Sequence, residues 1–473
     1  MSDPSSAAGL LGRVLGLQRS TPVYATSSFS EWLPSGGPPL WPPSAQAGLV
    51  LIDTADIRDR HTHAELRPTL VTQHQAAFIL GRAAPHGVLR RLSLRRILRR
   101  RQDRQTSSQI EQSLGIPREG VFVSRLGFQD ESGIPSEFSV SQPGAGGGTA
   151  LLVTRAPAFS GGLWSALAER LADSPCGVTE LQLRTRGAAV LLLKGARCDY
   201  VVRIVDDAKL RPVVMRNHDS LSSLRSELGG DPELLDKLPE PLAALEHEGA
   251  LVLVETRLPG TLAWRVDRGG IGARAYGDAV AFLERMRRAT LQAPVHGVDD
   301  LMRTDLQRAS SSQVPGHAVR DLLLDELAAS TAALRDVRVT PGTSHGDFGF
   351  GNVLVDETTG ALTGVIDWDT ARAADVPGID RVNLEIQLAR GRHSLDFADA
   401  VRRAHETGAI EAALSPIAGE AGVRPLFGLA VCRYIIRSFT YPAVYAGEAP
   451  AFERALEWLA GRGRDRVPGV FGK

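Results

Sequence analysis

The sequence contains few cysteines and no long apolar run. Its three cysteines, in 473 residues, lie far apart and include no CxxC pair, which argues against a disulfide framework or a zinc site and favours a reducing compartment. No stretch of about 18 apolar residues is present, the length that a membrane-spanning helix needs, and the first 30 residues hold no apolar run of signal-peptide length. We therefore expect a cytoplasmic protein without a transmembrane segment.

The chain also lacks an excess of charge of either sign. Lys plus Arg number 54 and Asp plus Glu number 54, so the formal net charge is zero. No overall field therefore favours nucleic acid as a partner. Lysine itself is scarce, because only four of the basic residues are lysines and the rest are arginines. The 43% of hydrophobic and 23% of charged residues are ordinary for a globular chain with room for two or three domains.

We expect residues 1–175 to form a separate N-terminal module, whose function the sequence does not reveal. The Gly- and Pro-rich stretch 35–43 cannot continue a helix or a central strand, and a short strand is expected at 49–52. The Gly-rich stretch 143–148 is followed by neither a helix start nor a Lys-Ser/Thr pair. A linker therefore fits it better than a phosphate-binding loop.

A dense run of arginines at 87–105 is the most distinctive part of this module. Leu94, Ile97 and Leu98 share helical spacing, which predicts a helix with one apolar stripe and a basic face. Two interpretations stay open. The helix is either an ordinary surface helix with solvated arginines, or it makes a peripheral contact with an anionic membrane or another polyanion.

The second part of the chain has the pattern of a small sheet followed by helices. Strands are expected at 189–194, 200–205, 213–215 and 251–255, and helices at 220–228, 277–293, 317–337 and within 380–473. The expected fold class is α+β and bilobal, with a small, mostly antiparallel sheet lobe at 176–260 and a helical lobe at 261–473. The natural ligand site of such an arrangement lies between the lobes.

The most informative stretch is a predicted β-hairpin. Its two apolar runs, 353–355 and 364–366, flank a polar turn. If the hairpin is centred between residues 359 and 360, Asn352 lies opposite Asp367, with their Cα atoms about 4.5–5.5 Å apart. An amide oxygen and a carboxylate at one end of a hairpin suit Mg²⁺, which takes few protein ligands and completes its shell with phosphate and water.

A Gly-rich loop with a second carboxylate precedes the hairpin. Asp347 lies five residues before Asn352, and Gly349 and Gly351 permit the backbone to fold back sharply. Asp347 can then lie a few ångströms from the metal pair, where it can accept a proton from an attacking hydroxyl group. We count His345 with Asp347 in the catalytic loop and expect it to brace the loop by hydrogen bonding rather than to react.

The order of these motifs resembles a known family. His-Gly-Asp, an Asn five residues later, and Ile-Asp-Trp-Asp after a turn are similar to the pattern of the aminoglycoside phosphotransferase and choline kinase-like family, relatives of the protein kinases. The resemblance covers roughly residues 180–473 and is strongest at 344–384. It implies a protein-kinase-like fold and transfer of the γ-phosphoryl group of ATP to a hydroxyl group of a small molecule.

The resemblance also implies roles for single residues. Asp347 would be the catalytic base, and Asn352 and Asp367 would hold Mg²⁺. Asp380 matches the family's downstream Asp, for which a structural role is expected. Asp369 is a further acidic neighbour, and both metal tuning and turn capping stay open for it.

The nucleotide-binding part of the pattern departs from the family. Members usually carry a lysine on the third strand of the small lobe, paired with a helix Glu, but the strand predicted there, 213–215, is followed by Arg216 instead. Arg203 is a substitute if its strand is in fact the third one, and Lys194 is another. Glu227, on the following helix, is the natural acidic partner.

The segment 253–260 resembles the family's hinge, where backbone groups near Glu255 and Arg257 would meet adenine. A strand edge before the Pro259-Gly260 turn would explain the same residues structurally.

Two functions of different classes follow. The leading hypothesis is an ATP- and Mg²⁺-dependent kinase of a small hydroxylated molecule, and the alternative is a catalytically silent kinase-like module that binds a nucleotide or has a regulatory role. Asp380 and Glu385 would favour a cationic acceptor if they lined its pocket, although carboxylates on helix surfaces are commonplace. The sequence specifies neither the acceptor nor the oligomeric state.

Overall fold

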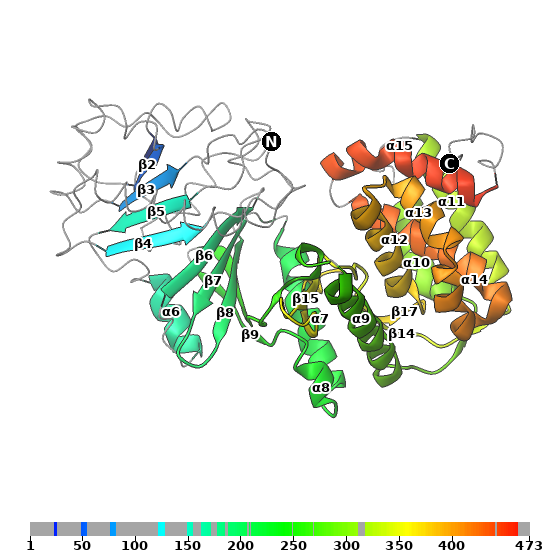
Figure 1. Cartoon of the computed structure of the whole chain (residues 1–473), viewed down its shortest axis with the longest axis horizontal. Coiled ribbons are helices and arrows are strands. Elements are labelled where there is room, and N and C mark those ends of the chain that lie inside the picture. Colours follow the sequence, from blue (N-terminus) through cyan, green and yellow to red (C-terminus); the bar gives the residue numbers. More distant parts are fainter. Residues whose placement is uncertain are drawn as a thin grey trace. The chain divides into compact units, whose positions relative to one another are not determined.

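The computed structural model describes most of the chain from residue 188 onward and shorter stretches before it (Figure 1). The described residues are 23–25, 49–53, 76–81, 122–127, 149–154, 162–171, 177–184, 188–205, 208, 210–247, 249–267, 269–310, 317–439 and 442–461. The chain divides into two compact units. Unit 1 comprises Met1–Met215 with Pro241–Arg257, and unit 2 comprises Arg216–Glu240 with Leu258–Lys473. The expected domain limits at residues 175 and 260 stay predictions.

Unit 1 begins with a five-stranded sheet. Its strand order is β1 (Val23–Ala25), β2 (Leu49–Asp53), β3 (Ala76–Gly81), β5 (Thr149–Thr154) and β4 (Phe122–Gly127). The first three strands run parallel, and β5 is antiparallel to both β3 and β4. The strand expected at 49–52 falls within β2. The basic run 87–105 and the Gly-rich stretch 143–148 lie outside the described residues.

The second sheet of unit 1 is fully antiparallel. Its order is β6 (Gly177–Arg184), β7 (Ala188–Lys194), β8 (Asp199–Val205), β10 (Ala250–Thr256) and β9 (Pro241–His247), and helix α6 (Gly162–Leu171) precedes it. Buried and half-buried side chains alternate along β8, as expected of a strand whose two faces differ. This small antiparallel sheet, together with the helices of unit 2, confirms the expected α+β fold class.

One predicted strand is wrong. Residues 213–215 belong to helix α7 (Arg211–Glu227), so β8 is the third strand of this sheet in chain order. Pro212 is the second residue of the helix, and proline is favoured in the first turn, where its missing N–H group is not needed. Val214 and Met215 pack against Leu251 and Leu253 of β10, and this contact favours the helix over a third hairpin strand.

Unit 2 combines many helices with short strands. In chain order these are α8 (Pro232–Leu235), β11 (Thr261–Leu262), the 3₁₀ helix η1 (Ala263–Arg265), α9 (Gly269–Ala289), β12 (Val295–His296), α10 (Asp299–Ser310), α11 (His317–Ala333), β13 (Arg338–Val339), β14 (Gly342–Ser344), β15 (Val353–Val355), β16 (Leu362–Val365), β17 (Arg372–Asp375), α12 (Ile379–His393), α13 (Phe397–Glu406), α14 (Ala409–Ser438) and α15 (Pro442–Leu459). The strands pair as β11-β15-β16, β12-β13 and β14-β17. None of the described helices combines the length and the apolar composition that a bilayer crossing requires.

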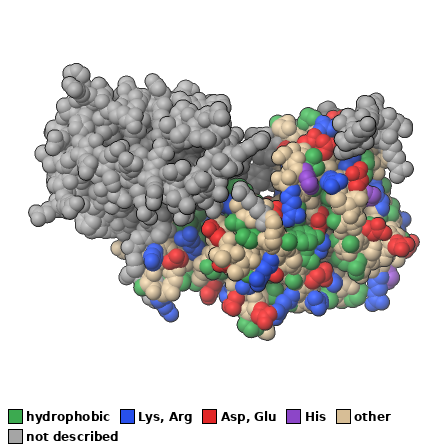
Figure 2. Space-filling model, viewed as in Figure 1, with side chains coloured by type: hydrophobic (Ala, Val, Ile, Leu, Met, Phe, Trp, Pro, Cys, Tyr) green, Lys and Arg blue, Asp and Glu red, His purple; other side chains and the backbone are tan. Residues whose placement is uncertain are grey.

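Two hydrophobic cores stabilise unit 2. The larger core lies among helices α10 to α15, and the second packs Phe282 of α9 against Phe348 and Trp368, which are both fully buried. Burying a side chain of this size contributes roughly 1.5–3 kcal/mol. Since Phe348 and Trp368 flank the predicted site residues in sequence, this second core fixes the backbone of the site. On the face seen in Figure 2, the acidic and basic side chains of the described residues are interspersed.

A buried network of charges joins α10, α14 and the β14-β17 pair. The guanidinium of Arg433 contacts Asp305 at 2.7 Å and pairs with Asp375, and both carboxylates are 1% exposed. Arg372 reaches Asp305 through two further bonds of 2.6 and 2.8 Å. Burial raises the pKa of Asp305, but the bonds and charges of Arg372 and Arg433 outweigh it and hold the pKa below its ordinary value.

We expect Arg433→Met to reduce the free energy of unfolding of unit 2 by about 3–5 kcal/mol, because two buried carboxylates then lose a cationic partner. Arg303→Met is the matched control. Arg303 pairs with Asp300 at the surface, with side chains 68% and 86% exposed, and its loss should cost less than about 1 kcal/mol. Urea unfolding followed by circular dichroism measures both. Equal losses in the two variants would contradict the role of the network.

Candidate functional site

The candidate site of unit 2 lies in the loop between β14 and β15. β14 is fixed by β17, with Gly342 opposite Asp375 and Ser344 opposite Arg372. The Ser344 hydroxyl group donates to the Asp375 carboxylate, which belongs to the buried charge network. Backbone pairing with β17 and the Ser344 side chain therefore both fix the strand from which the loop starts.

Asp380, in the first turn of α12, holds the start of this loop. Its carboxylate accepts hydrogen bonds from the backbone N–H groups of His345 at 2.6 Å and of Gly346 at 2.8 Å. The side chain is buried, and burial raises its pKa, although the two backbone hydrogen bonds act in the opposite direction. A single carboxylate thus satisfies two consecutive backbone donors that would otherwise be buried without partners.

The next polar residues of α12 continue these contacts. Asn383 lies three residues after Asp380, and Gln387 lies four residues after Asn383, so all three side chains share one helix face. The Asn383 amide donates to the Gly346 carbonyl oxygen at 3.2 Å, and the Gln387 amide donates to Asp347 Oδ1 at 3.1 Å. Neither Asn383 nor Gln387 was predicted from the sequence, and their spacing from Asp380 was the signal that could have found them.

The sharp bend of the loop occurs at Gly346. Its φ is +79°, and a Cβ atom there would lie 2.5 Å from the carbonyl oxygen of Thr370. Both facts require glycine at this position. The bend was expected at Gly349 and Gly351, but neither has a positive φ. Gly349 instead allows the Gln387 side chain to approach, since a Cβ atom there would overlap Gln387 Oε1.

His345 is buried, and both of its ring nitrogens have partners. Nδ1 accepts a hydrogen bond from the backbone N–H of Asp347 at 3.2 Å, and Nε2 lies 2.9 Å from the carbonyl oxygen of Ile366. A carbonyl oxygen can only accept, so Nε2 carries the proton and Nδ1 does not. The ring also lies 4.5 Å from the Trp368 ring. This geometry connects the loop to the far strand of the hairpin and leaves the imidazole no free nitrogen for a substrate.

Asp347 presents its carboxylate at the partly exposed end of the loop. The side chain is 29% exposed. Its Oδ1 atom accepts the hydrogen bond from Gln387 and forms an ion pair with Arg437 of α14, and its backbone oxygen accepts a 2.9 Å hydrogen bond from the Asn352 amide. Among the described residues, Oδ2 has no hydrogen-bond donor. Arg437 was not among the residues predicted from the sequence.

The hairpin has a register one residue away from the predicted one. Val353 pairs with Val365, and the N–H of Ile366 donates to the carbonyl oxygen of Asn352 at 2.9 Å. Asn352 is therefore opposite Ile366 and not Asp367. The turn is the cause, because the Val355–Leu362 pair centres it between residues 358 and 359, one residue earlier than predicted. The bulge after Leu354 adds one unpaired residue and brings the register part of the way back. Asp367 follows the paired residues and has a φ of +70°.

Asn217 of α7 fixes the residue after Asp367. Its side-chain oxygen accepts a 2.7 Å hydrogen bond from the backbone N–H of Trp368, and the side chain is buried. Asn217, Leu221 and Leu224 are the buried residues of this helix. Asn217 was not predicted either, although an asparagine at the spacing of a buried apolar stripe is a signal that could have identified it.

The other charged residues predicted on this part of the chain lie away from Asp347. The Glu227 carboxylate, at the end of α7, is 3.4 Å from the Thr343 hydroxyl group. Arg216 is part of α7 and follows no strand. Its charge acts on Arg308 of α10, whose pKa is lowered first by burial and then by the charges of Arg372 and Arg216.

Unit 1 holds the remaining predicted residues. Arg203 on β8 forms an ion pair of 3.2 Å with Glu255 on β10, and the two side chains are 23% and 10% exposed. Arg203 is opposite Leu253, so Arg203 and Glu255 are diagonal neighbours on one face of the sheet. The acidic partner of Arg203 is thus a strand residue, whereas Glu227 was the expected partner. Arg257 donates its backbone N–H to the Asp199 carbonyl oxygen at 2.8 Å.

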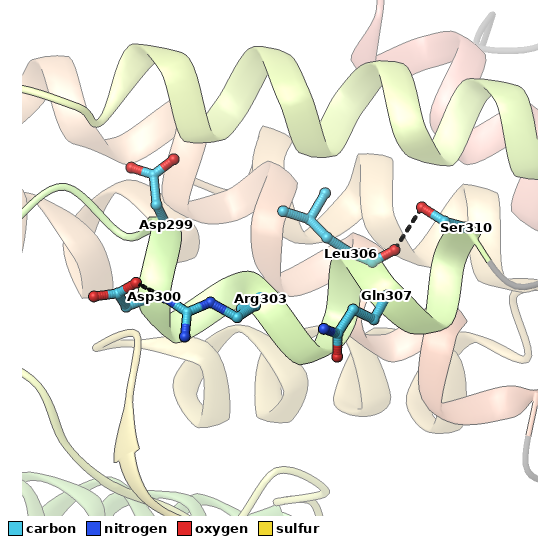
Figure 3. A pocket seen from close by; sticks show the side chains of 6 residues that line it. All are labelled: Asp299, Asp300, Arg303, Leu306, Gln307 and Ser310. Atoms are coloured by element: carbon cyan, nitrogen blue, oxygen red, sulfur yellow. Dashed lines mark hydrogen bonds and ion pairs between the residues drawn. The ribbon is translucent and has the colours of Figure 1, made fainter.

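Two cavities in the described part of unit 2 are not lined by Asp347, Asn352 or Asp367. A hollow of about 570 Å³ on α10 is lined by Asp299, Asp300, Arg303, Leu306, Gln307 and Ser310 (Figure 3). A second cavity, behind the loop and beside Asp380, has a volume of about 40 Å³, enough for a few water molecules. Neither cavity presents a group that the site chemistry would use.

A comparison with protein families decides the class of this site. Residues 179–376 match the phosphotransferase enzyme family. The matched segment contains the loop with Asp347 and the hairpin with Asn352 and Asp367. The match confirms the family resemblance, the kinase-like fold and the phosphotransferase class of enzyme that the sequence predicts. None of the curated proteins compared with the chain matches it.

Several solved structures are similar to the chain. A thermostable mutant of aminoglycoside phosphotransferase APH(4)-Ia, in its apo form, is 18% identical with a TM-score of 0.45, and the alignment covers 64% of this chain and 99% of that one. Aminoglycoside phosphotransferase APH(3'')-Id from Streptomyces rimosus is 18% identical with a TM-score of 0.35, over 57% of this chain and 94% of that one. At these identities and TM-scores, no residue role or substrate is transferred from them.

We expect His345→Gln to reduce kcat for phosphoryl transfer by about 10–100-fold, because the loop that carries Asp347 loses a brace and its position shifts. The shape of the profile of kcat between about pH 5 and 8 should not change, since a brace takes no part in proton transfer. His296→Gln, at an exposed position, is the control and should match the unaltered chain. Loss of one limb of the pH profile in His345→Gln would show that His345 itself titrates in catalysis.

Proposed function

We propose that the chain is a kinase that transfers the γ-phosphoryl group of ATP to a hydroxyl group of a small molecule, with Asp347 as the base. One observation carries the proposal. Asp347 is the partly exposed carboxylate of a loop that is otherwise fixed through its backbone, its histidine and its glycine. The family match supports the reaction class, and the geometry supports the choice of residue.

Asp347 would accept the proton that the acceptor releases in this reaction. The acceptor hydroxyl group donates a hydrogen bond to Asp347 Oδ2, the oxygen that has no donor among the described residues. As the acceptor oxygen bonds to the γ-phosphorus, the bond from that phosphorus to the β–γ bridging oxygen breaks and ADP leaves with the electron pair. The hydroxyl proton passes to Asp347 and then to solvent. Phosphoryl transfer of this kind depends mainly on positioning and electrostatics.

Asn352 and Asp367 have the donor atoms that Mg²⁺ takes. The Asn352 amide uses its nitrogen to bond the Asp347 backbone oxygen, which turns its oxygen away from that contact and leaves it for a cation. Bound at these residues, Mg²⁺ would neutralise charge on the phosphates. The hydrogen bond from Trp368 to Asn217 keeps the backbone beside Asp367 in place. The hydrogen bond from Asn352 to the Asp347 backbone oxygen keeps Asn352 close to the loop that carries Asp347.

Arg203 is the proposed substitute for the family's third-strand lysine. It lies on β8, the third strand of the second sheet, and its side chain is partly exposed. The ion pair with Glu255 orients its guanidinium. A guanidinium binds phosphate through a planar pair of donors, whereas an ammonium acts as a point charge. We also place the reaction in the cytoplasm, a location compatible with the exposed free thiol of Cys198.

We expect Asp347→Asn to lower kcat for phosphoryl transfer by about 10²–10⁴-fold, since the amide cannot accept the hydroxyl proton. Binding of Mg²⁺-ADP, measured by calorimetry, should stay within about twofold, because the proposed role of Asp347 is toward the acceptor hydroxyl group and not toward ADP. Asp321→Asn, on α11 with its side chain 68% exposed, is the control. Transfer that is equally absent from the unaltered chain and Asp347→Asn, with nucleotide binding retained, would favour the silent module.

We expect Arg203→Met to raise KM for ATP about tenfold, which corresponds to about 1.4 kcal/mol of binding, while Arg203→Lys should retain most of the affinity. Steady-state kinetics with varied ATP measures the change. Arg170→Met, at an exposed position on α6 of the same unit, should leave KM unchanged. An unaltered KM in Arg203→Met would remove Arg203 from the nucleotide site.

A further inference from the structure

A guanidinium group lies directly beside the proposed base. Arg437 Nη1 pairs with Asp347 Oδ1 and is 3.4 Å from the Gly346 carbonyl oxygen. The guanidinium carbon lies 4.7 Å from the centre of the Tyr434 ring, and the side chain is 19% exposed. Arg437 is thus partly accessible and packed on an aromatic face, and it shares the carboxylate that the acceptor hydroxyl group must reach.

Tyr434, the residue against which Arg437 packs, also contacts a second arginine. The Tyr434 hydroxyl group accepts a 2.9 Å hydrogen bond from Arg390 of α12, whose other donor contacts Glu448 of α15 at 2.7 Å. Burial lowers the pKa of Arg390, but Tyr434 and Glu448 more than compensate and raise it. Arg390 therefore stays charged, and the Glu448 carboxylate is bound to it.

The other acidic candidates of the helical part are engaged as well. Asp380 accepts the two backbone hydrogen bonds of the loop. Glu385 accepts from the Tyr276 hydroxyl group at 2.6 Å and from Arg381 at 2.9 Å, and the pKa of Tyr276 is raised to about 12 by burial and by this contact. The carboxylates that could have favoured a cationic acceptor therefore already have partners, and a polycation near Asp347 would meet the charge of Arg437.

We infer that the acceptor is a hydroxylated anion, with a carboxylate or phosphate group close to the reacting hydroxyl, and that Arg437 binds this group. The inference rests on the proposed function and names its substrate class. A carboxylate or phosphate has the geometry that a guanidinium binds through two parallel hydrogen bonds. When the acceptor anion takes over these donors, Asp347 Oδ1 loses its ion pair while Oδ2 accepts the hydroxyl proton. Without an acceptor, Arg437 stays paired with Asp347 Oδ1.

Matched acceptors that differ only in charge test this inference. The full chain, with Mg²⁺ and ATP, is given glucose, glucosamine, glucuronate and glucose 6-phosphate, and then the four corresponding galactose compounds, and phosphorylated products are measured by mass spectrometry. We expect kcat/KM for the anionic members to exceed that for the neutral and cationic members about tenfold or more, the size of one charge-assisted contact. The uronates and the sugar phosphates distinguish a carboxylate from a phosphate subsite.

Variants of Arg437 complete the test. We expect Arg437→Gln to lower the ratio of kcat/KM for the anions to kcat/KM for glucose about tenfold or more, whereas Arg437→Lys should keep part of the preference. The control is Arg454→Gln on α15, which removes an exposed ion pair between Arg454 and Asp396. Thermal unfolding of each variant verifies folding, and Arg437→Lys serves as the test variant if Arg437→Gln is unfolded.

The outcomes separate the two proposals. Preference for glucosamine or glucose over the anions, or an equal loss on all acceptors in Arg437→Gln, overturns the anionic class and leaves the kinase function in place. A chain that binds Mg²⁺-ADP but phosphorylates no member of either series contradicts the proposed function and this inference together.

Discussion

The two hydrogen bonds that the buried Asp380 carboxylate accepts are the interaction on which the candidate site depends. A buried carboxylate is unfavourable unless its oxygens find donors, and consecutive backbone N–H groups without acceptors are equally unfavourable. The His345 and Gly346 amides and the Asp380 oxygens resolve both problems at once. The position of Asp347 follows, because it is the next residue of a backbone fixed in this way.

Helix α14 connects this site to the buried charge network. Arg433 and Arg437 are four residues apart and lie on the same side of the helix. Arg433 binds Asp305 and Asp375 behind the β14-β17 pair, and Arg437 binds Asp347. The β14-β17 pair that leads into the loop and the Asp347 carboxylate within the loop are thus held by two arginines one turn apart on the same helix. Guanidinium groups suit both places, since each can bond several oxygens in one plane.

Much of the fold and of the candidate site could be predicted from the sequence, for physical reasons that also explain the errors. The loop and hairpin around Asp347 were found because their signals are local. The strand expected at 213–215 was wrong, since three apolar residues cannot distinguish a strand from a helix. The hairpin register was wrong because the turn is centred between residues 358 and 359, and an apolar pattern marks neither the exact centre of a turn nor a bulge. Arg437 was missed, since its contact with Asp347 joins residues distant in sequence.

The arginine on β8 has a further chemical consequence. A lysine amine that contacts nucleotide phosphates can lose its proton and attack an activated acyl group, which is how acyl phosphate analogues of ATP label many kinases covalently. A guanidinium stays protonated and is a poor nucleophile at neutral pH. If Arg203 binds the phosphates as proposed, beside Glu255, its guanidinium offers such reagents no amine on the third strand.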